Sequence, residues 1–140
     1  MNDFKEAFIV SVTDALDNHC NTLDLRVPLQ CKFWIEELPD QVQRFITLGG
    51  YRFYPDYIKV EQNNRTLTLF HSWKNYGVGV LPNNHPNWNY KYQVSFVLMN
   101  ERQEIVFLHT EPEAEPSEWL KGMSYNYLSQ FDIPAKLRGK

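Results

Sequence analysis

The segment WNYKYQVSFVLMNERQEIVFLHT, residues 88–110, decides the fold class. Apolar or aromatic residues occupy every second position from Trp88 to Leu98, and polar residues fill most positions between them. This period of two predicts a strand with one buried face and one solvent-facing face. A polar run then interrupts the pattern, and residues 105–110 resume it. We therefore expect a hairpin in which Leu98 lies opposite Ile105.

A second hairpin is predicted around Asn63–Asn64. Asparagine tolerates positive φ, so this pair suits the turn between two antiparallel strands. Apolar and polar residues alternate on both sides of it. The pattern sets Val60 opposite Leu67 and Ile58 opposite Leu69, and it gathers the polar side chains on the other face.

Three segments carry helix signals. Residues 4–18 repeat apolar side chains at spacings of three and four, which predicts a first helix capped by Asn2 or Asp3. Residues 39–48 start with Pro-Asp and are followed by two glycines, which predicts a short middle helix. Residues 117–131 start with a serine N-cap and precede a proline, which predicts a closing helix.

The segment between the first two helices alternates again. Every odd position from Leu23 to Ile35 is apolar, which predicts another strand. Pro28 lacks a backbone N–H and therefore belongs at an edge or a break. Trp34 would then lie on the solvent-facing side, as an exposed aromatic residue.

Together these segments predict an α+β fold. We expect a mainly antiparallel, curved β-sheet of about five or six strands. An N-terminal helix, a short middle helix and a C-terminal helix would pack on one face of it. No linker or repeat divides the chain, so residues 1–140 are expected to form a single α+β domain.

Composition narrows the classes of partner. A net charge of −3 and a pI near 5.8 make nucleic acid an unlikely ligand, since nonspecific binding requires a basic face. The two cysteines, Cys20 and Cys31, do not have the spacing of a metal or redox motif. No apolar run suits a membrane, and acidic residues near the N-terminus differ from a signal peptide, so we expect a cytoplasmic protein. We expect neither a metal nor a cofactor.

No strong catalytic motif is present, and the histidines offer the one candidate for chemistry. His71 and His109 each follow two apolar residues on the buried face of a predicted strand. If those strands are neighbours, the imidazoles could share a pocket and act as acid and base, with Glu111 or Asp56 as a carboxylate partner. The alternative is that both are core-edge histidines hydrogen bonded to the backbone.

Other residues suit recognition of a partner. A polar loop stiffened by two prolines lies beside aromatic residues, and a cluster of glutamates follows the second hairpin. The candidate partner-binding residues are Trp34, Trp88, His85, Asn83, Asn84, Glu111, Glu113, Glu115 and Glu118.

Two functions follow from this sequence. The first is a noncatalytic protein-binding module, such as a stoichiometric inhibitor of the immunity-protein or antitoxin type that masks a basic partner. The alternative is a small-ligand-binding or enzymatic α+β cup that uses His71 and His109. The sequence leaves the oligomeric state open.

Overall fold

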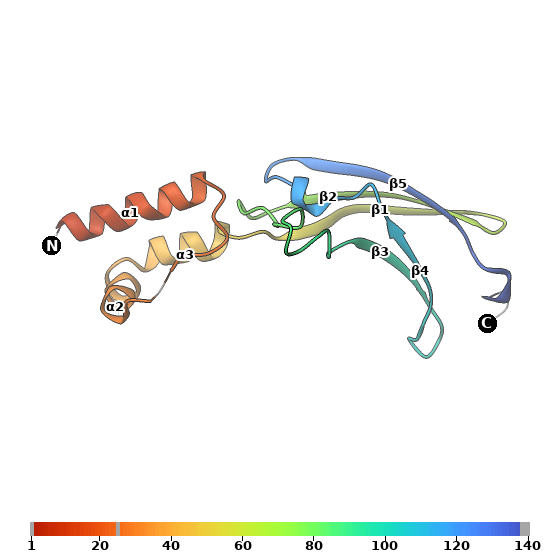
Figure 1. The fold of residues 1–140 in the computed structure, drawn as a ribbon, viewed down its shortest axis with the longest axis horizontal. Coiled ribbons are helices and arrows are strands. Elements are labelled where there is room, and N and C mark those ends of the chain that lie inside the picture. Colours follow the sequence, from red (N-terminus) through yellow and green to blue (C-terminus); the bar gives the residue numbers. More distant parts are fainter. Residues whose placement is uncertain (1, 25, 138–140) are drawn as a thin grey trace.

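The structure, a computed structural model, describes residues 2–24 and 26–137, except for the side chains of Asn2 and Lys136. The predicted cap by Asn2 therefore lies outside the described side chains. Three helices come first, and strands follow them. The molecule is elongated, with the helices at one end and the strands at the other (Figure 1). The helices are α1 (Asn2–Asp17), α2 (Pro28–Glu37) and α3 (Pro39–Leu48), and the strands are β1 (Phe53–Asn63), β2 (Thr66–Asn75), β3 (Val94–Met99), β4 (Ile105–Glu111) and β5 (Ser124–Asp132).

Helix α1 confirms the first predicted helix, and α3 confirms the middle one. The α1 stripe of Phe8, Val12 and Leu16 is buried, as its four-residue spacing requires. Pro39 occupies the first turn of α3, where its missing N–H costs nothing. Helix α3 ends before Gly49, whose N–H donates to the Phe45 carbonyl at 2.7 Å.

The strand predicted over residues 23–35 is wrong. Pro28 begins helix α2, and its fixed φ suits a helix start better than a break inside a strand. The alternating residues also fall at helical spacing, since Leu29 and Phe33 are four apart. Most of the segment is unbranched at Cβ, which removes the usual preference for strands. Leu25 lies outside the described residues.

The predicted closing helix is also wrong. Residues 116–118 form a single 3-10 turn, η1 (Pro116–Glu118), and β5 follows it. Gly122 has φ +83, which ends any helix begun at Ser117. Tyr125 and Phe131 fall on one face of a strand with period two, and aromatic residues favour strands.

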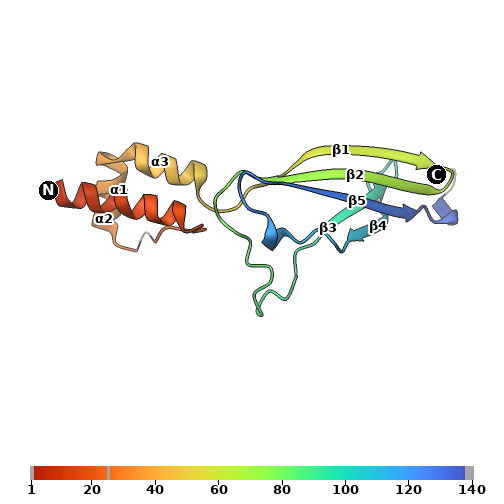
Figure 2. The ribbon, with the colours of Figure 1, turned by 90° about the horizontal axis from the view of Figure 1, so that it is seen from above.

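The strands form two antiparallel sheets rather than one sheet of about five or six strands. The first has the order β1-β2-β5, and the second contains β3 and β4. The helices lie beyond the end of the first sheet and do not pack on its face, contrary to expectation (Figure 2). The β3–β4 hairpin lies against the first sheet instead, through contacts such as that of Phe96 with His71. The curvature of the sheet and the single domain stay predictions.

Both hairpins are confirmed, with registers shifted by two residues. Val60 pairs with Leu69 rather than Leu67, because the turn uses Asn64, at φ 54, and the residue after it. In the other hairpin Leu98 pairs with Phe107. A shift of two keeps each side chain on its predicted face. Residues 88–93 are not part of β3, which begins at Val94.

Two separate hydrophobic cores result. We call residues 2–50 the helical unit and residues 51–137 the β unit. The first core surrounds Phe8, Val12 and Leu16 of the helical unit, and the second surrounds Trp119 of the β unit.

A close backbone contact joins the units. Gly79 donates its N–H to the Gly50 carbonyl at 2.7 Å, and a Cβ at Gly77 would lie 2.0 Å from the same oxygen. A Cβ at Gly79 would lie 2.6 Å from the carbonyl carbon of Gly50, so both positions require glycine.

Candidate functional site: an apolar groove between α1 and α2

A large apolar hollow lies in the helical unit. Its volume is about 690 Å³, and ten residues from α1, α2 and the segment between them form its walls. Only two of the ten are polar. The lining residues are Phe4, Ala7, Phe8, Ser11, Leu23, Val27, Leu29, Gln30, Phe33 and Trp34.

The groove exists because the helical unit does not complete its core. Neither α2 nor α3 has a fully buried residue. Leu29 exposes 82% of its surface and Phe4 exposes 68%, values that are high for large apolar side chains in a monomer. A contiguous exposed apolar surface of this kind indicates an interaction site.

Trp34 lies in this groove rather than on the face of a strand. It is half-buried and stacks on Phe8, with ring centroids 4.3 Å apart and planes inclined by 14°. The stack fixes the indole as a rigid wall. Trp34 therefore stays a candidate partner-binding residue, because it lines the groove from α2 and not because it lies on the exposed face of a strand.

The helical unit is also the acidic part of the chain. Residues 1–50 contain eight acidic and four basic residues, a net charge of −4, whereas residues 51–140 contain nine acidic and ten basic residues, a net charge of +1. The basic side chains are already engaged. Lys5 pairs with Glu37 at 2.9 Å, and Arg44 donates to Thr13 at 3.0 Å.

Several carboxylates of the helical unit remain without such partners. In the described part of the chain, no ion pair involves Asp3, Glu6, Asp14, Asp17 or Asp40. An apolar groove within a negative field suits a partner that is apolar where it docks and basic around the contact.

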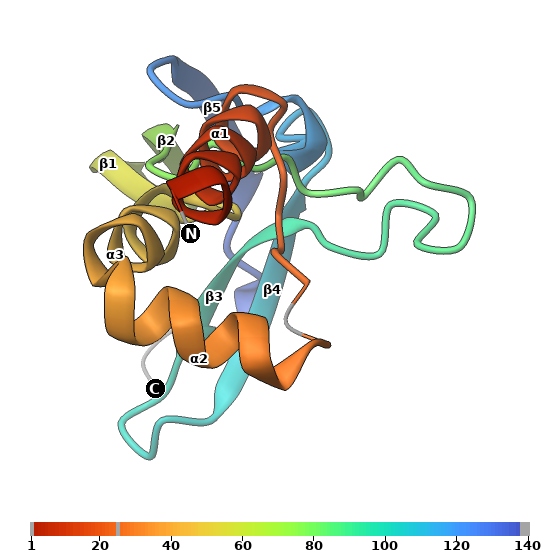
Figure 3. The same cartoon turned by 90° about the vertical axis from the view of Figure 1, so that its left-hand side faces the viewer.

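The predicted recognition loop and the acidic segment meet in the β unit. The connection from β2 to β3 extends sideways from the body of the molecule (Figure 3). Asn83, within it, is fully buried and donates to Glu115 at 3.0 Å and to the Tyr92 carbonyl at 2.8 Å. Burial alone would raise the pKa of Glu115, but hydrogen bonds from Ser117 and Asn83 outweigh it and lower that pKa. Asn83 and Glu115 therefore join the β2–β3 connection to the segment before β5.

The remaining loop candidates differ in accessibility. Asn84, His85, Glu113 and Glu118 are exposed. Trp88 is half-buried, and the Lys91 ammonium lies 5.9 Å from its ring centroid. The exposed ones stay candidates for a partner contact.

Glu111 belongs to a buried hydrogen-bond network in the β unit. The Trp73 indole donates to His71 Nδ1 at 2.9 Å, so the ring proton of His71 resides on Nε2. That nitrogen lies 3.0 Å from Ser129 Oγ, which in turn donates to the Glu111 carboxylate. His71 exposes only 1% of its surface.

Burial favours the neutral form of His71. Burial lowers the pKa of His71 from its ordinary value of 6.5, and the negative charge of Glu111 opposes this only in part. Both ring nitrogens are occupied by protein groups. The network therefore satisfies buried polar atoms, as folded interiors require, and it offers no free nitrogen for proton transfer in this conformation.

His109 occupies a different place. It is half-buried and stacks on Phe131, with ring centroids 4.3 Å apart. The carboxylate of Asp56 bonds Lys74 at 2.8 Å rather than a histidine. An aromatic-lined hollow of about 440 Å³ in the β unit includes neither His71 nor His109 in its walls. The acid–base role of the two histidines stays a prediction.

Sequence reasoning missed the groove and Ser129. Leu29 and Phe33 were assigned to the core face of a strand, and their four-residue spacing, together with Pro28 as a helix start, was the signal for α2. Ser129 was hidden inside a predicted helix. Across residues 2–24 and 26–137, no group of three potential ligands could hold a metal ion, and no helix has the length and apolarity that crossing a membrane requires.

Comparisons of this chain with protein-family models, with curated proteins and with solved structures find no match. The function is therefore argued from the groove and its charges.

Proposed function

We propose that this protein is a noncatalytic protein-binding module that receives a basic partner in the groove between α1 and α2. The observation that carries the proposal is the open apolar groove itself, placed in the part of the chain with a net charge of −4. Burial of such surface drives association, and the surrounding charge selects and steers the partner.

The openness of the groove favours a protein over a small ligand. Sites for small molecules enclose most of the ligand surface, about 70–90% of it. Here Leu29 and Phe4, on two different walls, expose most of their surface. An occupant that covers both must be broad, and a second protein provides such a surface.

A stoichiometric inhibitor of the immunity-protein or antitoxin type is the more specific form of this proposal. Tight inhibitors place a rigid aromatic anchor inside a charged rim. Trp34, half-buried and stacked on the buried Phe8, is the proposed anchor, and the unpaired carboxylates of α1 lie on the helix that forms one wall of the groove. A cytoplasmic location and a basic partner belong to the same proposal.

The alternative function, a ligand-binding or enzymatic cup, is supported by no contact of the described residues. His71 has both ring nitrogens engaged, and neither histidine lines the hollow of the β unit. The protein-binding function therefore fits the geometry better.

Affinity capture from native cell extract tests the proposal, with Leu29→Gln as the groove variant. Ile46→Gln is the matched control, because Ile46 is 56% exposed on α3 and lies outside the groove. Both substitutions remove an exposed aliphatic side chain and leave the net charge unchanged. We expect one protein to be retained in equal amount by the wild type and the control, and to be lost with Leu29→Gln.

Salt dependence completes the test. Electrostatic attraction between exposed charges is screened as ionic strength rises, so retention of the partner should fall with added salt. Absence of a stoichiometric partner at low salt would contradict the proposal. Equal retention by Leu29→Gln would contradict the assignment to the groove.

A further inference from the structure

The outermost strand of the first sheet, β5, has a free edge without the usual protective features. The sequence SYNYLSQFD, residues 124–132, contains no proline and no lysine, and its one charge is the terminal Asp132. Its register with β2 runs unbroken over nine pairs. Exposed edges normally carry charges, prolines or bulges that prevent pairing with another chain.

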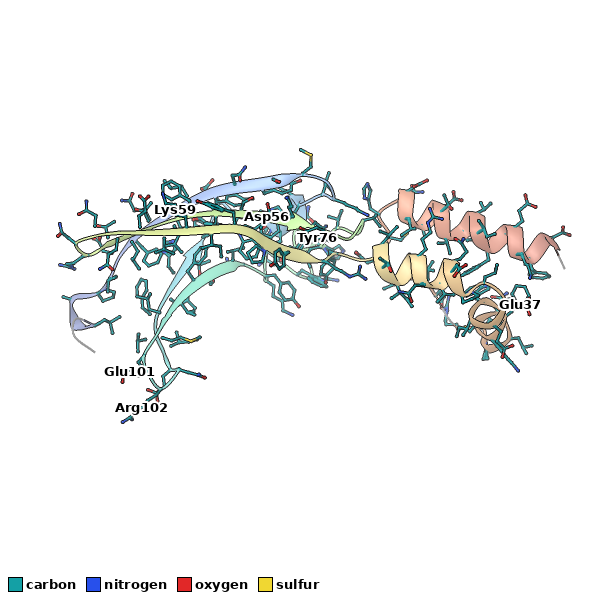
Figure 4. The ribbon with its side chains drawn as sticks, turned by 180° about the vertical axis from the view of Figure 1, so that it is seen from behind. Glu37, Asp56, Lys59, Tyr76, Glu101 and Arg102 are labelled. Carbon is teal, nitrogen blue, oxygen red and sulfur yellow. The ribbon has the colours of Figure 1, made fainter. Side chains whose placement is uncertain are left out.

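The opposite edge of the sheet, β1, does carry such protective features. Its register shifts between Pro55 and Tyr57, so a bulge interrupts the strand. Asp56 and Lys59 both lie on this strand (Figure 4), and Glu61 adds a third charge. The sheet is therefore protected at one edge and open at the other.

Backbone alternation identifies the groups that the open edge presents. Ile133, directly after β5, donates its N–H to the Arg65 carbonyl at 2.7 Å, on the β2 side. Successive residues of a strand direct their backbone groups to opposite sides. The odd-numbered residues of β5 therefore bond β2, and Asn126, Leu128 and Gln130 direct their N–H and C=O groups outward. In the described part of the chain, no hydrogen bond outside the strand ladders uses these groups.

We propose that β5 pairs with β5 of a second copy of this chain, forming a two-fold dimer with a continuous six-stranded sheet. A two-fold interface requires a patch that complements itself. Antiparallel pairing centred on Leu128 sets Asn126 opposite Gln130 of the second copy and Ser124 opposite Asp132. No like charges then face each other, whereas a register centred on Asp132 would set two carboxylates opposite.

Side chains on the outer face support the same register. Leu128 is 55% exposed and pairs with Phe70 of β2, which is also exposed. Pairing about Leu128 would join these residues to their copies in one row of four apolar side chains across the new sheet. The row would cover an apolar surface that water reaches in the monomer.

Sedimentation velocity of the whole protein from about 1 to 100 µM tests the dimer, since that range reveals dissociation constants in the micromolar region. We expect a species of twice 16.7 kDa at the upper end. Leu128→Lys should abolish it, because two ammonium groups would meet at the axis. Leu108→Lys is the matched control, since Leu108 is 54% exposed on β4, and it should leave the dimer intact. Mixing Leu128→Lys with Leu128→Glu should restore a dimer.

Amide exchange provides a second readout. At the higher concentration the amides of Asn126, Leu128 and Gln130 should exchange about tenfold or more slowly, while those of Tyr127 and Ser129 should not change, because β2 already protects them. A monomer at every concentration, a dimer that withstands Leu128→Lys, or a mixture that stays monomeric would each overturn the proposal. None of these results bears on the groove at Leu29.

Discussion

The helical unit and the β unit differ in how completely they enclose their cores. In the β unit, Trp119 contacts the rings of Phe53 and Trp73, at centroid distances of 5.0 and 5.3 Å, and exposes only 1% of its surface. In the helical unit, large side chains of α1 and α2 line an open groove. The β unit buries an aromatic core around Trp119, whereas the core of the helical unit opens into a groove. Both units also expose apolar side chains that a partner can cover, such as Leu29 and Leu128.

The strongest expected effect is the loss of Trp119. Trp119→Ala removes a ring that contacts several aromatic residues and donates to the Tyr127 hydroxyl at 2.8 Å. We expect the free energy of unfolding to fall by about 3–5 kcal/mol, the usual cost for a large buried aromatic residue. Urea unfolding followed by near-ultraviolet circular dichroism measures it.

Val12→Ala is the corresponding substitution in the core of the helical unit. Val12 is fully buried, and loss of its two methyl groups should cost about 2 kcal/mol. A smaller loss for Trp119→Ala than for Val12→Ala would contradict a self-sufficient β core.

The hydrogen-bond network of the β unit gives a smaller effect. Ser129→Ala removes the hydroxyl that joins His71 to Glu111 and leaves two buried polar groups unsatisfied. We expect a loss of about 1–3 kcal/mol in the free energy of unfolding. Ser95→Ala serves as control because Ser95 is exposed and bonds Thr110, and its effect should stay within about 0.5 kcal/mol. Equal effects of both variants would argue against the network.

The pH dependence of stability provides a subtler test of the same network. The folded-state pKa of His71 lies below 6.5, so the unfolded chain binds a proton more readily. Stability should therefore fall as the pH drops through 6.5 and should level out once folded His71 is protonated. Glu115 affects stability in a different pH range. Its folded-state pKa is lowered, so its contribution to the free energy of unfolding is lost only as the pH falls below 4.5.

Urea unfolding at a series of pH values from 8 to about 5 measures this slope. His71→Gln should reduce it, and His85→Gln should not, since His85 is exposed in the loop after β2. An unchanged slope in His71→Gln would show that another group titrates.

Local patterns predicted the parts of the fold that depend on neighbouring residues. The stripe of α1 and both hairpins followed from spacing, and the two-residue shifts left each side chain on its predicted side of the strand because strands have a period of two. Ile58, Val60 and Ile105 lie on those sides and are nevertheless exposed. The strand predicted over Leu23–Ile35 was wrong because its apolar positions satisfy both periods, and the position of Pro28 and the few β-branched residues were the signals that favoured the helix.

Long-range contacts decided the rest. The segment after Ser117 has helix-compatible spacing, and its pairing with β2 made it a strand. Glu111 was expected beside a histidine, and the structure connects it to His71 through Ser129, a residue that local reasoning had placed in a helix. The groove could not be foreseen, since it depends on how α2 meets α1.

Photo-crosslinking in native cells tests the central contrast most directly. A photoreactive amino acid would replace Leu29, 82% exposed in the groove, or Ile46, exposed outside it. We expect one discrete adduct from position 29, weakened by salt when the experiment is repeated in extract, and none from position 46. No adduct from position 29, or the same adducts from both positions, would contradict this expectation.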